Sequence, residues 1–133
     1  MPYMLDTDIC IYIGKNRPAE VRARFEKLGP GSVLISVITY GELFYGASKS
    51  ENPEGSFAQL DLFLQGVQVE PLTWGAARQY GHLQATLERK GRMIGNNDLW
   101  IAAHALDLGL TLVTNNEREF HRVPGLKIEN WAA

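Results

Sequence analysis

Residues 97–113, NDLWIAAHALDLGLTLV, show most clearly how this chain folds. Apolar residues recur at helical spacing from Asp98 to Leu108, and Gly109 then supplies a typical helix stop. Residues 110–113 are apolar and partly β-branched, which predicts a buried strand directly after the helix. A helix followed at once by a continuous apolar strand is typical of α/β folds.

The same alternation extends over the rest of the chain. The predicted strands are 3–5, 33–35, 67–69, 110–113 and 126–128, and the predicted helices are 9–13, 18–28, 36–47, 53–64, 73–90, 97–108 and a short turn at 117–120. Because the strands are continuous apolar runs without in–out alternation, we expect a parallel sheet with helices on both faces. The prediction is a three-layer α/β/α sandwich in one domain, residues 1–133.

Two local patterns make further predictions. Gly41 and Gly46 interrupt the helix predicted at 36–47, where each costs about 1 kcal/mol relative to Ala, and they suggest close packing there. The helix at 73–90 carries an apolar stripe made of Trp74, Ala77, Tyr80, Leu83 and Leu87.

Composition excludes several classes of protein. With 45% hydrophobic and 21% charged residues, the 133-residue chain has ordinary globular usage, so global disorder is excluded. Its net charge of −2 means that nucleic acid would have to meet a local basic patch. The single cysteine, Cys10, lies between apolar residues, and neither a targeting signal nor a membrane span is visible. We expect a cytoplasmic protein with no membrane contact.

Three carboxylates stand in apolar surroundings. Asp6 directly follows the first strand, Glu42 lies between Ile38 and Tyr45 on its helix, and Asp98 heads the apolar stripe of its helix. Partly dry carboxylates are costly unless they are paired or bind a cation. Mg²⁺ or Mn²⁺ suits such oxygens and can activate water against a phosphodiester, so the pattern indicates phosphodiester hydrolysis.

Each of these acids also has a purely structural interpretation. Asp98, with Asn96 or Asn97, can cap its helix, where negative charge is favourable. Glu42 can pair with a surface arginine. A side-chain oxygen of Thr7 or Asp8, or of Asp6 itself, can cap the turn after the first strand, and Ser36 can cap the helix that follows the second.

Three stretches together resemble a known family: MLDTDICIYI at 4–13, ISVITYGELFYGA at 35–47 and IGNNDLWIAAHALDLGLTLVTNNEREF at 94–120. They are similar to PIN-domain ribonucleases of the VapC type, the toxins of bacterial type II toxin–antitoxin modules. The resemblance covers nearly the whole chain and includes the apolar residues around the acids. It implies a compact Rossmann-like α/β/α sandwich.

Carried over position by position, the resemblance makes Asp6, Glu42 and Asp98 metal ligands, with Glu42 bound directly or through water. The family often has a further acid in a Thr-x-Asp pattern after the late strand, where this chain has Thr114-Asn115-Asn116. We expect Asn116 to fill that position, with Glu119 supplying charge in support. Four polar residues match places that line or support the family's site: Thr7, Asp8, Ser36 and Thr114.

The resemblance also implies an activity and its control. The expected activity is Mg²⁺- or Mn²⁺-dependent endoribonuclease cleavage of structured RNA, most commonly tRNA, by in-line attack of water that leaves a 5′-phosphate and a 3′-hydroxyl. The expected partners are a second copy of the chain and a small VapB-type antitoxin, whose DNA-binding half brings the complex to its own operator in the bacterial cytoplasm.

One dense basic cluster precedes Asp98. Arg89, Lys90 and Arg92 can guide RNA phosphate towards a metal, or they can simply complement the dipole at a helix C-terminus. Arg118 and Arg122 carry the same ambiguity.

Two rival functions remain at this point. Asp6-Thr7-Asp8 fits the DxD of an aspartyl phosphatase, with Asp6 as nucleophile and Asp8 as acid. Alternatively, the chain is a non-catalytic partner-binding or co-repressor module whose carboxylates have a structural role, an interpretation that the missing fourth acid favours.

Overall fold

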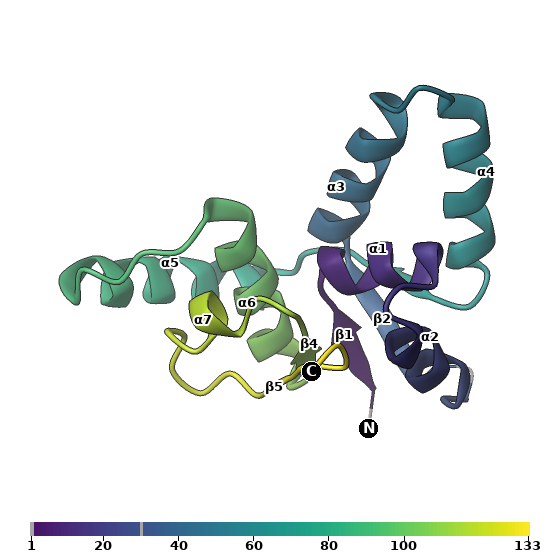
Figure 1. Cartoon of the computed structure of the whole chain (residues 1–133). Helices are drawn as coiled ribbons and strands as arrows, with labels where there is room; N and C mark the ends of the chain where they lie inside the picture. Colours follow the sequence, from purple (N-terminus) through teal and green to yellow (C-terminus); the bar gives the residue numbers. More distant parts are fainter. Residues whose placement is uncertain (1, 30) are drawn as a thin grey trace.

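The structure is a computed structural model that describes residues 2–29 and 31–133, and its centre is a parallel β-sheet (Figure 1). Within those residues the sheet has five strands in the order β3-β2-β1-β4-β5. The strands are β1 (Tyr3–Leu5), β2 (Val33–Ser36), β3 (Gln68–Glu70), β4 (Thr111–Val113) and β5 (Ile128–Glu129). Central β1 pairs Met4 with Leu34 of β2 and with Leu112 of β4.

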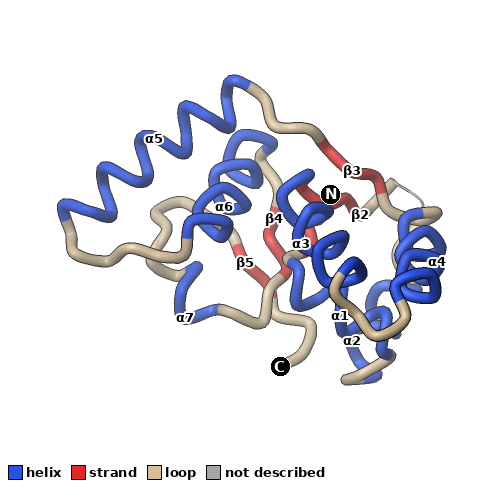
Figure 2. The backbone as a smooth tube through the Cα atoms, turned by 90° about the horizontal axis from the view of Figure 1, so that it is seen from above, coloured by secondary structure: helices blue, strands red, loops and turns tan. Residues whose placement is uncertain are grey.

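Helices connect the strands and cover both faces of the sheet. They are α1 (Thr7–Lys15), α2 (Ala19–Glu26), α3 (Val37–Ser48), α4 (Pro53–Leu64), α5 (Trp74–Arg89), α6 (Asn96–Leu108) and α7 (Glu117–Phe120). Figure 2 shows α5 and α6 on one side of the strands and α1 and α2 on the other. The predicted three-layer parallel architecture is therefore confirmed. None of these helices combines the length and apolarity that crossing a bilayer requires.

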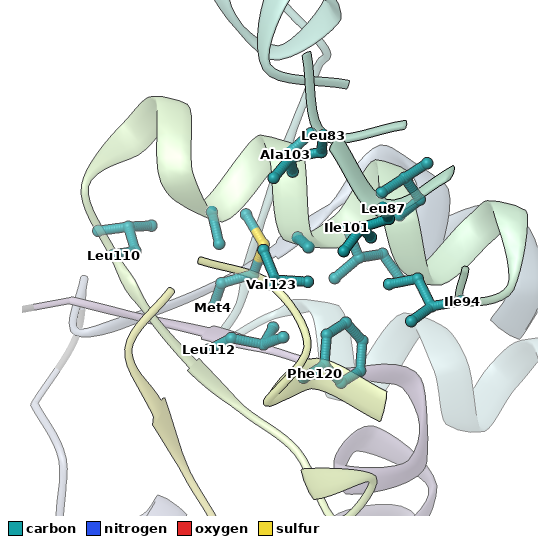
Figure 3. Packing of buried hydrophobic residues seen from close by; sticks show 13 residues of the cluster. Met4, Leu83, Leu87, Ile94, Ile101, Ala103, Leu110, Leu112, Phe120 and Val123 are labelled. Carbon is teal, nitrogen blue, oxygen red and sulfur yellow. The ribbon is translucent and has the colours of Figure 1, made fainter. Parts of the chain in front are cut away.

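Neighbouring residues of each central strand point into different cores. Met4 and Leu112 join the core beneath α5 and α6, which also contains Leu87 and Phe120 (Figure 3). The adjacent Leu5 joins the second core, beneath α1 and α2. Because both faces of the strands are apolar and covered, the alternation typical of a half-exposed sheet is absent.

Side-chain caps and a glycine set the helix ends. The Ser36 hydroxyl accepts the Ile38 N–H over 3.1 Å and starts α3, as predicted. Asp6 caps α1 by accepting the Thr7 N–H, so the alternatives Thr7 and Asp8 are wrong for this cap. At the end of α6, Gly109 takes the left-handed conformation with φ 68°, which a residue without Cβ adopts freely.

One packing prediction is wrong, and a second is confirmed only in part. Gly41 and Gly46 do not mark close packing, because no atom outside the local helix backbone lies within 4 Å of the position where a Cβ would stand. Figure 1 shows that α3 and α4 project together from the sheet.

The stripe predicted on α5 is correct for Leu83 and Leu87, which are buried, and for Tyr80, which packs against the same core. It is wrong for Ala77, which is exposed, and for Trp74, which is 84% exposed; Ala76 is buried instead. A two-residue step turns about 200° around a helix, so Trp74 and Ala76 point to opposite sides of α5.

Candidate active site

The site is built where β1, β2 and β4 end. Asp6 follows β1, Ser36 closes β2, and Thr114 follows β4, so parallel pairing brings three distant segments to one edge of the sheet. In open α/β sheets this edge is the usual position of a functional site. Glu42 on α3 and Asp98 on α6 reach the same edge from the helices that flank it.

Asp6 is the most deeply buried acid of the site, at 5% exposure. Its Oδ1 accepts the N–H of Thr7 over 2.8 Å, and its Oδ2 accepts the Thr114 hydroxyl over 2.7 Å. Burial raises the pKa of Asp6 to about 7, with further contributions from the charges of Asp8 and Glu42, while the two hydrogen bonds oppose the rise.

Glu42 is held from two sides. Its Oε1 accepts the Thr7 hydroxyl over 2.5 Å, and its Oε2 accepts the side-chain amide of Asn97 over 3.3 Å. These bonds join α1, α3 and α6 around one carboxylate. The interpretation that Glu42 pairs with a surface arginine is wrong within the described residues.

Asp98 is half-buried in the first turn of α6. The N-cap of α6 is Gly95, so the interpretation that Asp98, Asn96 or Asn97 is the capping residue is wrong. Asp98 does lie in the first turn, where a negative charge is favourable, as that interpretation also expected. Burial raises the pKa of Asp98 to about 8, assisted by a hydrogen bond with Glu119 and by the charges of Asp6, Glu119 and Glu42.

Glu119 and Asn116 form a unit at the position where the sequence departs from the family pattern. The side-chain amide of Asn116 donates to Glu119 Oε2 over 2.5 Å, and the N–H of Gly95 donates to Glu119 Oε1 over 2.7 Å. Burial alone would raise the pKa of Glu119, but these hydrogen bonds and the nearby Arg122 charge hold it below its ordinary value. Glu119 therefore keeps its negative charge beside Asp98.

The four acids influence one another electrostatically without a bound cationic side chain. Asp6, Glu42 and Glu119 all contribute to the raised pKa of Asp98, which places them in one neighbourhood. Within residues 2–29 and 31–133 no Lys, Arg or His forms an ion pair with any of the four. Because no ion-paired side chain favours the ionised forms of these carboxyls, a bound cation would do so, and this edge of the sheet is suited to one.

Hard divalent cations fit this donor set in kind, since Mg²⁺ and Mn²⁺ prefer carboxylate oxygens. The side chains as they lie do not form a closed cage. In the part of the chain that the structure describes, no three Asp, Glu, His or Cys side chains are grouped closely enough to hold one ion together. With the side chains in these positions, water would complete the coordination of a cation, and Mg²⁺ usually keeps several waters.

The predicted supporting residues lie at different depths. Thr7 and Thr114 contact the acids directly, as described above. Asp8 accepts the Asn115 N–H over 3.2 Å, which ties α1 to the loop after β4. Its Oδ1 is buried and has no hydrogen-bond partner among the described residues. Ser36 is fully buried and bonds Nδ1 of His104 over 2.8 Å, so it braces α6 against β2 beneath the acids.

The basic cluster forms no ion pair with the acids within the described residues. Arg89, Lys90 and Arg92 are exposed at and just beyond the end of α5, and Arg89 bonds the hydroxyl of Thr86 one turn earlier on the same helix. The predicted contact with RNA stays a prediction.

Sequence reasoning missed the functional contacts of Asn97 and Gly95. The sequence suggested only a helix-capping role for Asn97, whereas its side-chain amide donates a hydrogen bond to Glu42. The Gly95 N–H binds Glu119 across 24 positions of sequence. Hydrophobic periodicity does not predict contacts between residues so far apart in sequence. The only indication in the sequence was the group of polar residues that precedes the apolar stripe of α6.

Comparison with known proteins adds to this geometry. Residues 3–126 match the PIN domain family. The chain is a PIN-domain protein. It is 46% identical to "Ribonuclease VapC2" of Haemophilus influenzae over 98% of both chains, and 46% identical to "tRNA(fMet)-specific endonuclease VapC" of Shigella flexneri over 99% of both.

Solved structures agree with the sequence comparison. The PIN-domain fold of this chain is similar to that in the crystal structure of VapBC2 from Rickettsia felis bound to a DNA fragment from their promoter. The TM-score is 0.90 at 42% identity, over 98% of this chain and 99% of the other. The predicted membership of the VapC ribonuclease family is thereby confirmed, together with the Rossmann-like sandwich.

Proposed function

We propose that this PIN-domain protein is a metal-dependent endoribonuclease toxin that cleaves tRNA. The proposal depends most on the gathering of Asp6, Glu42, Asp98 and Glu119 at one edge of the sheet without an ion-paired cation among the described residues. Such an arrangement is costly for the protein alone and favourable once a divalent cation is bound.

The four acids and Asn116 have separate roles in this proposal. Asp6 and Asp98 hold Mg²⁺ or Mn²⁺, because their raised pKa values mark them as the carboxylates whose charge most lacks compensation. Bound there, the cation supplies a Lewis acid for a phosphodiester oxygen. Glu42, fixed by Thr7 and Asn97, would be the third acid that holds the cation, directly or through water.

Asn116 and Glu119 together fill the fourth position. Asn116 contributes no charge, and its amide orients Glu119. Glu119 supplies the negative charge that the family's Thr-x-Asp pattern places on the loop after β4. In this way the departure from the pattern is compatible with catalysis.

tRNA as substrate is supported by the name of the Shigella flexneri relative and by the exposed basic residues. Arg89 ends α5, and Lys90 and Arg92 follow it in the segment that leads to α6, where all three are exposed and can bind backbone phosphates of a structured RNA. Recognition there would depend on shape and charge.

Control by a VapB-type antitoxin is supported by the VapBC complexes among the similar structures. We propose that the chain works as a homodimer in the bacterial cytoplasm and that the antitoxin blocks its acids. The complex would reach operator DNA through the antitoxin, in line with the promoter DNA in the Rickettsia felis structure.

The test uses purified protein, free of any partner, with total tRNA. Cleavage is expected with Mg²⁺ and not with EDTA, and it should be lost in Asp6→Asn and Asp98→Asn. Asp61→Asn removes an exposed carboxylate from α4 and is the matched control that should remain active. RNA cutting that persists in EDTA, or in both site variants, would rule the proposal out.

The two rival functions make different predictions for the same samples. An aspartyl phosphatase would form a covalent phosphoryl adduct on Asp6, detectable by mass spectrometry, but Asp8, its proposed acid, already binds the Asn115 backbone. A non-catalytic module would leave tRNA intact in Mg²⁺. We expect neither result.

A further inference from the structure

The segment after β4 grips the loop that precedes α6 at two main-chain atoms. Glu119 Oε1 accepts the Gly95 N–H over 2.7 Å, and the guanidinium of Arg122 donates to the Met93 carbonyl over 2.8 Å. The backbone N–H of Arg122 bonds the carbonyl of Glu119, so the two side chains leave the same helical turn. One turn thus holds both an N–H and a C=O of the loop.

The gripped loop determines where Asp98 lies. Ile94 lies between Met93 and Gly95 and is buried in the same core as Phe120 of α7 (Figure 3). This burial anchors the loop to the core. The Gly95 carbonyl then accepts the Leu99 N–H over 2.9 Å and begins α6. Any shift of the loop at Met93 would therefore move the first turn of α6, and Asp98 with it.

The grip also governs the approach of the two carboxylates. A Cβ placed on Gly95 would lie 3.6 Å from Asp98 Oδ2 and 3.7 Å from Glu119 Oε1, so both carboxylates lie close to the Gly95 backbone. Arg122 stays beside Glu119 without forming an ion pair with it. Its guanidinium bonds the loop carbonyl instead of an acid of the site.

We propose that Arg122 is a positioning residue for the reaction: by holding Met93 it fixes the loop that sets Asp98 against Glu119. This inference rests on the proposed ribonuclease function. It replaces the two interpretations open from sequence, in which Arg122 either contacts RNA or complements a helix dipole. A guanidinium suits the role because it keeps its charge and offers several donors in a rigid plane.

The test compares Arg122→Ala and Arg122→Lys with Arg118→Ala. Arg118 is an exposed residue of α7, and its replacement removes the same charge without touching the loop bond. We expect Arg122→Ala to lower kcat for tRNA cleavage by about tenfold or more while KM changes by less than about threefold, as removal of a charged hydrogen bond predicts. Arg122→Lys should recover most of kcat, and Arg118→Ala should keep the kcat of the parent, whether or not Arg118 contacts RNA.

A second measurement does not depend on activity. Amide hydrogen exchange at Gly95 should accelerate in Arg122→Ala but not in Arg118→Ala, because only the former releases the loop. If Arg122→Ala fails to fold, as judged by circular dichroism, Arg122→Met keeps the length of the side chain without its donors and takes its place in both assays.

Three outcomes would overturn the proposal. A raised KM with unchanged kcat and a shallower salt dependence would make Arg122 an RNA contact. Equal kcat values in Arg122→Ala and Arg118→Ala would show that Arg122 has no positioning role. Unchanged Gly95 exchange would show that the grip does not hold the loop. If the parent protein cuts no RNA, the proposed function fails, whereas the exchange experiment still tests the grip itself.

Discussion

Thr114 donates its hydroxyl hydrogen to Oδ2 of Asp6 over 2.7 Å, across 108 positions of sequence. Both groups are buried at the ends of neighbouring strands β1 and β4. The bond favours the ionised form of Asp6 and opposes the rise in pKa that burial causes. It therefore helps the deepest acid of the site to be charged when it meets a cation.

Removing that hydroxyl should shift the pH dependence of cleavage. In Thr114→Val the pKa of Asp6 loses a hydrogen bond that lowers it, so we expect the acidic limb of the pH–rate profile to move to higher pH, with reduced activity at pH 7. The measurement is kcat/KM for tRNA across about pH 6 to 9. Thr114→Ser keeps the hydroxyl and should behave as the parent; a Val profile that overlays the Ser profile would contradict the prediction.

The metal-free protein should become less stable as pH rises. The pKa of Asp6 is raised from 3.8 to about 7 and that of Asp98 from 3.8 to about 8, so between about pH 4 and 8 the folded state binds more protons than the unfolded state. The free energy of unfolding then falls with pH in this window. Urea unfolding in EDTA at a series of pH values measures the slope.

Mg²⁺ should remove that slope. A cation that binds the ionised carboxylates stabilises only the folded state, so millimolar Mg²⁺ should raise stability far more at about pH 8 than at about pH 5. Asp6→Asn should flatten the slope in EDTA and weaken the Mg²⁺ effect. Equal Mg²⁺ effects at both pH values would argue against these two acids as its site.

Asn116→Asp restores the acid of the family pattern and should make the protein more dependent on metal. The new carboxylate loses the amide that binds Glu119 and adds repulsion to the acid cluster. We expect a lower melting temperature in EDTA at about pH 8 and a larger rise on adding Mg²⁺ than in the parent, measured by thermal denaturation. If the variant is as stable as the parent in EDTA, a charge at residue 116 is not repelled by the acids of the site.

The basic cluster predicts a salt effect. Neutralising Arg89, Lys90 and Arg92 together should raise KM for tRNA and reduce the slope of log KM against log salt, by about one unit of slope for each RNA phosphate that is no longer bound. All three are exposed, so stability should hardly change. Unchanged cleavage across a salt series would assign them to the helix end alone.

Two glycines should respond oppositely to alanine. At both Gly109 and Gly41 there is open space where a Cβ would stand, so a steric clash of the new methyl group is not expected at either position. Gly109 has φ 68°, and Gly109→Ala should destabilise by about 1–2 kcal/mol. Gly41 lies inside α3, where Gly41→Ala should stabilise by about 0.5–1 kcal/mol. Urea unfolding measures both, and a shared sign would refute the backbone explanation.

The order of elements was predictable because it depends on local patterns. The apolar strand at 33–35, the Ser36 cap and the Gly109 stop each depend on residues near them in sequence, and the structure contains all three. The stripe on α5 was less predictable, because Trp74 is apolar enough to be buried but lies on the wrong side of the helix for the sheet.

The sequence identified the acids of the site but did not predict their hydrogen-bond partners. Asp6, Glu42 and Asp98 were recognisable by their apolar surroundings and by the resemblance. Which groups hold them was decided by tertiary structure, since Thr114, Asn97 and Gly95 reach their partners across 108, 55 and 24 positions.

By itself, the sequence determined the parallel sheet, the helices that cover it and the residue types available at its edge, because hydrophobic periodicity and capping act within a few residues. Only the tertiary structure decided that Glu119 lies against Asp98 and that Arg122 binds the loop that precedes α6. Those contacts depend on how β4 and α6 pack on a shared core.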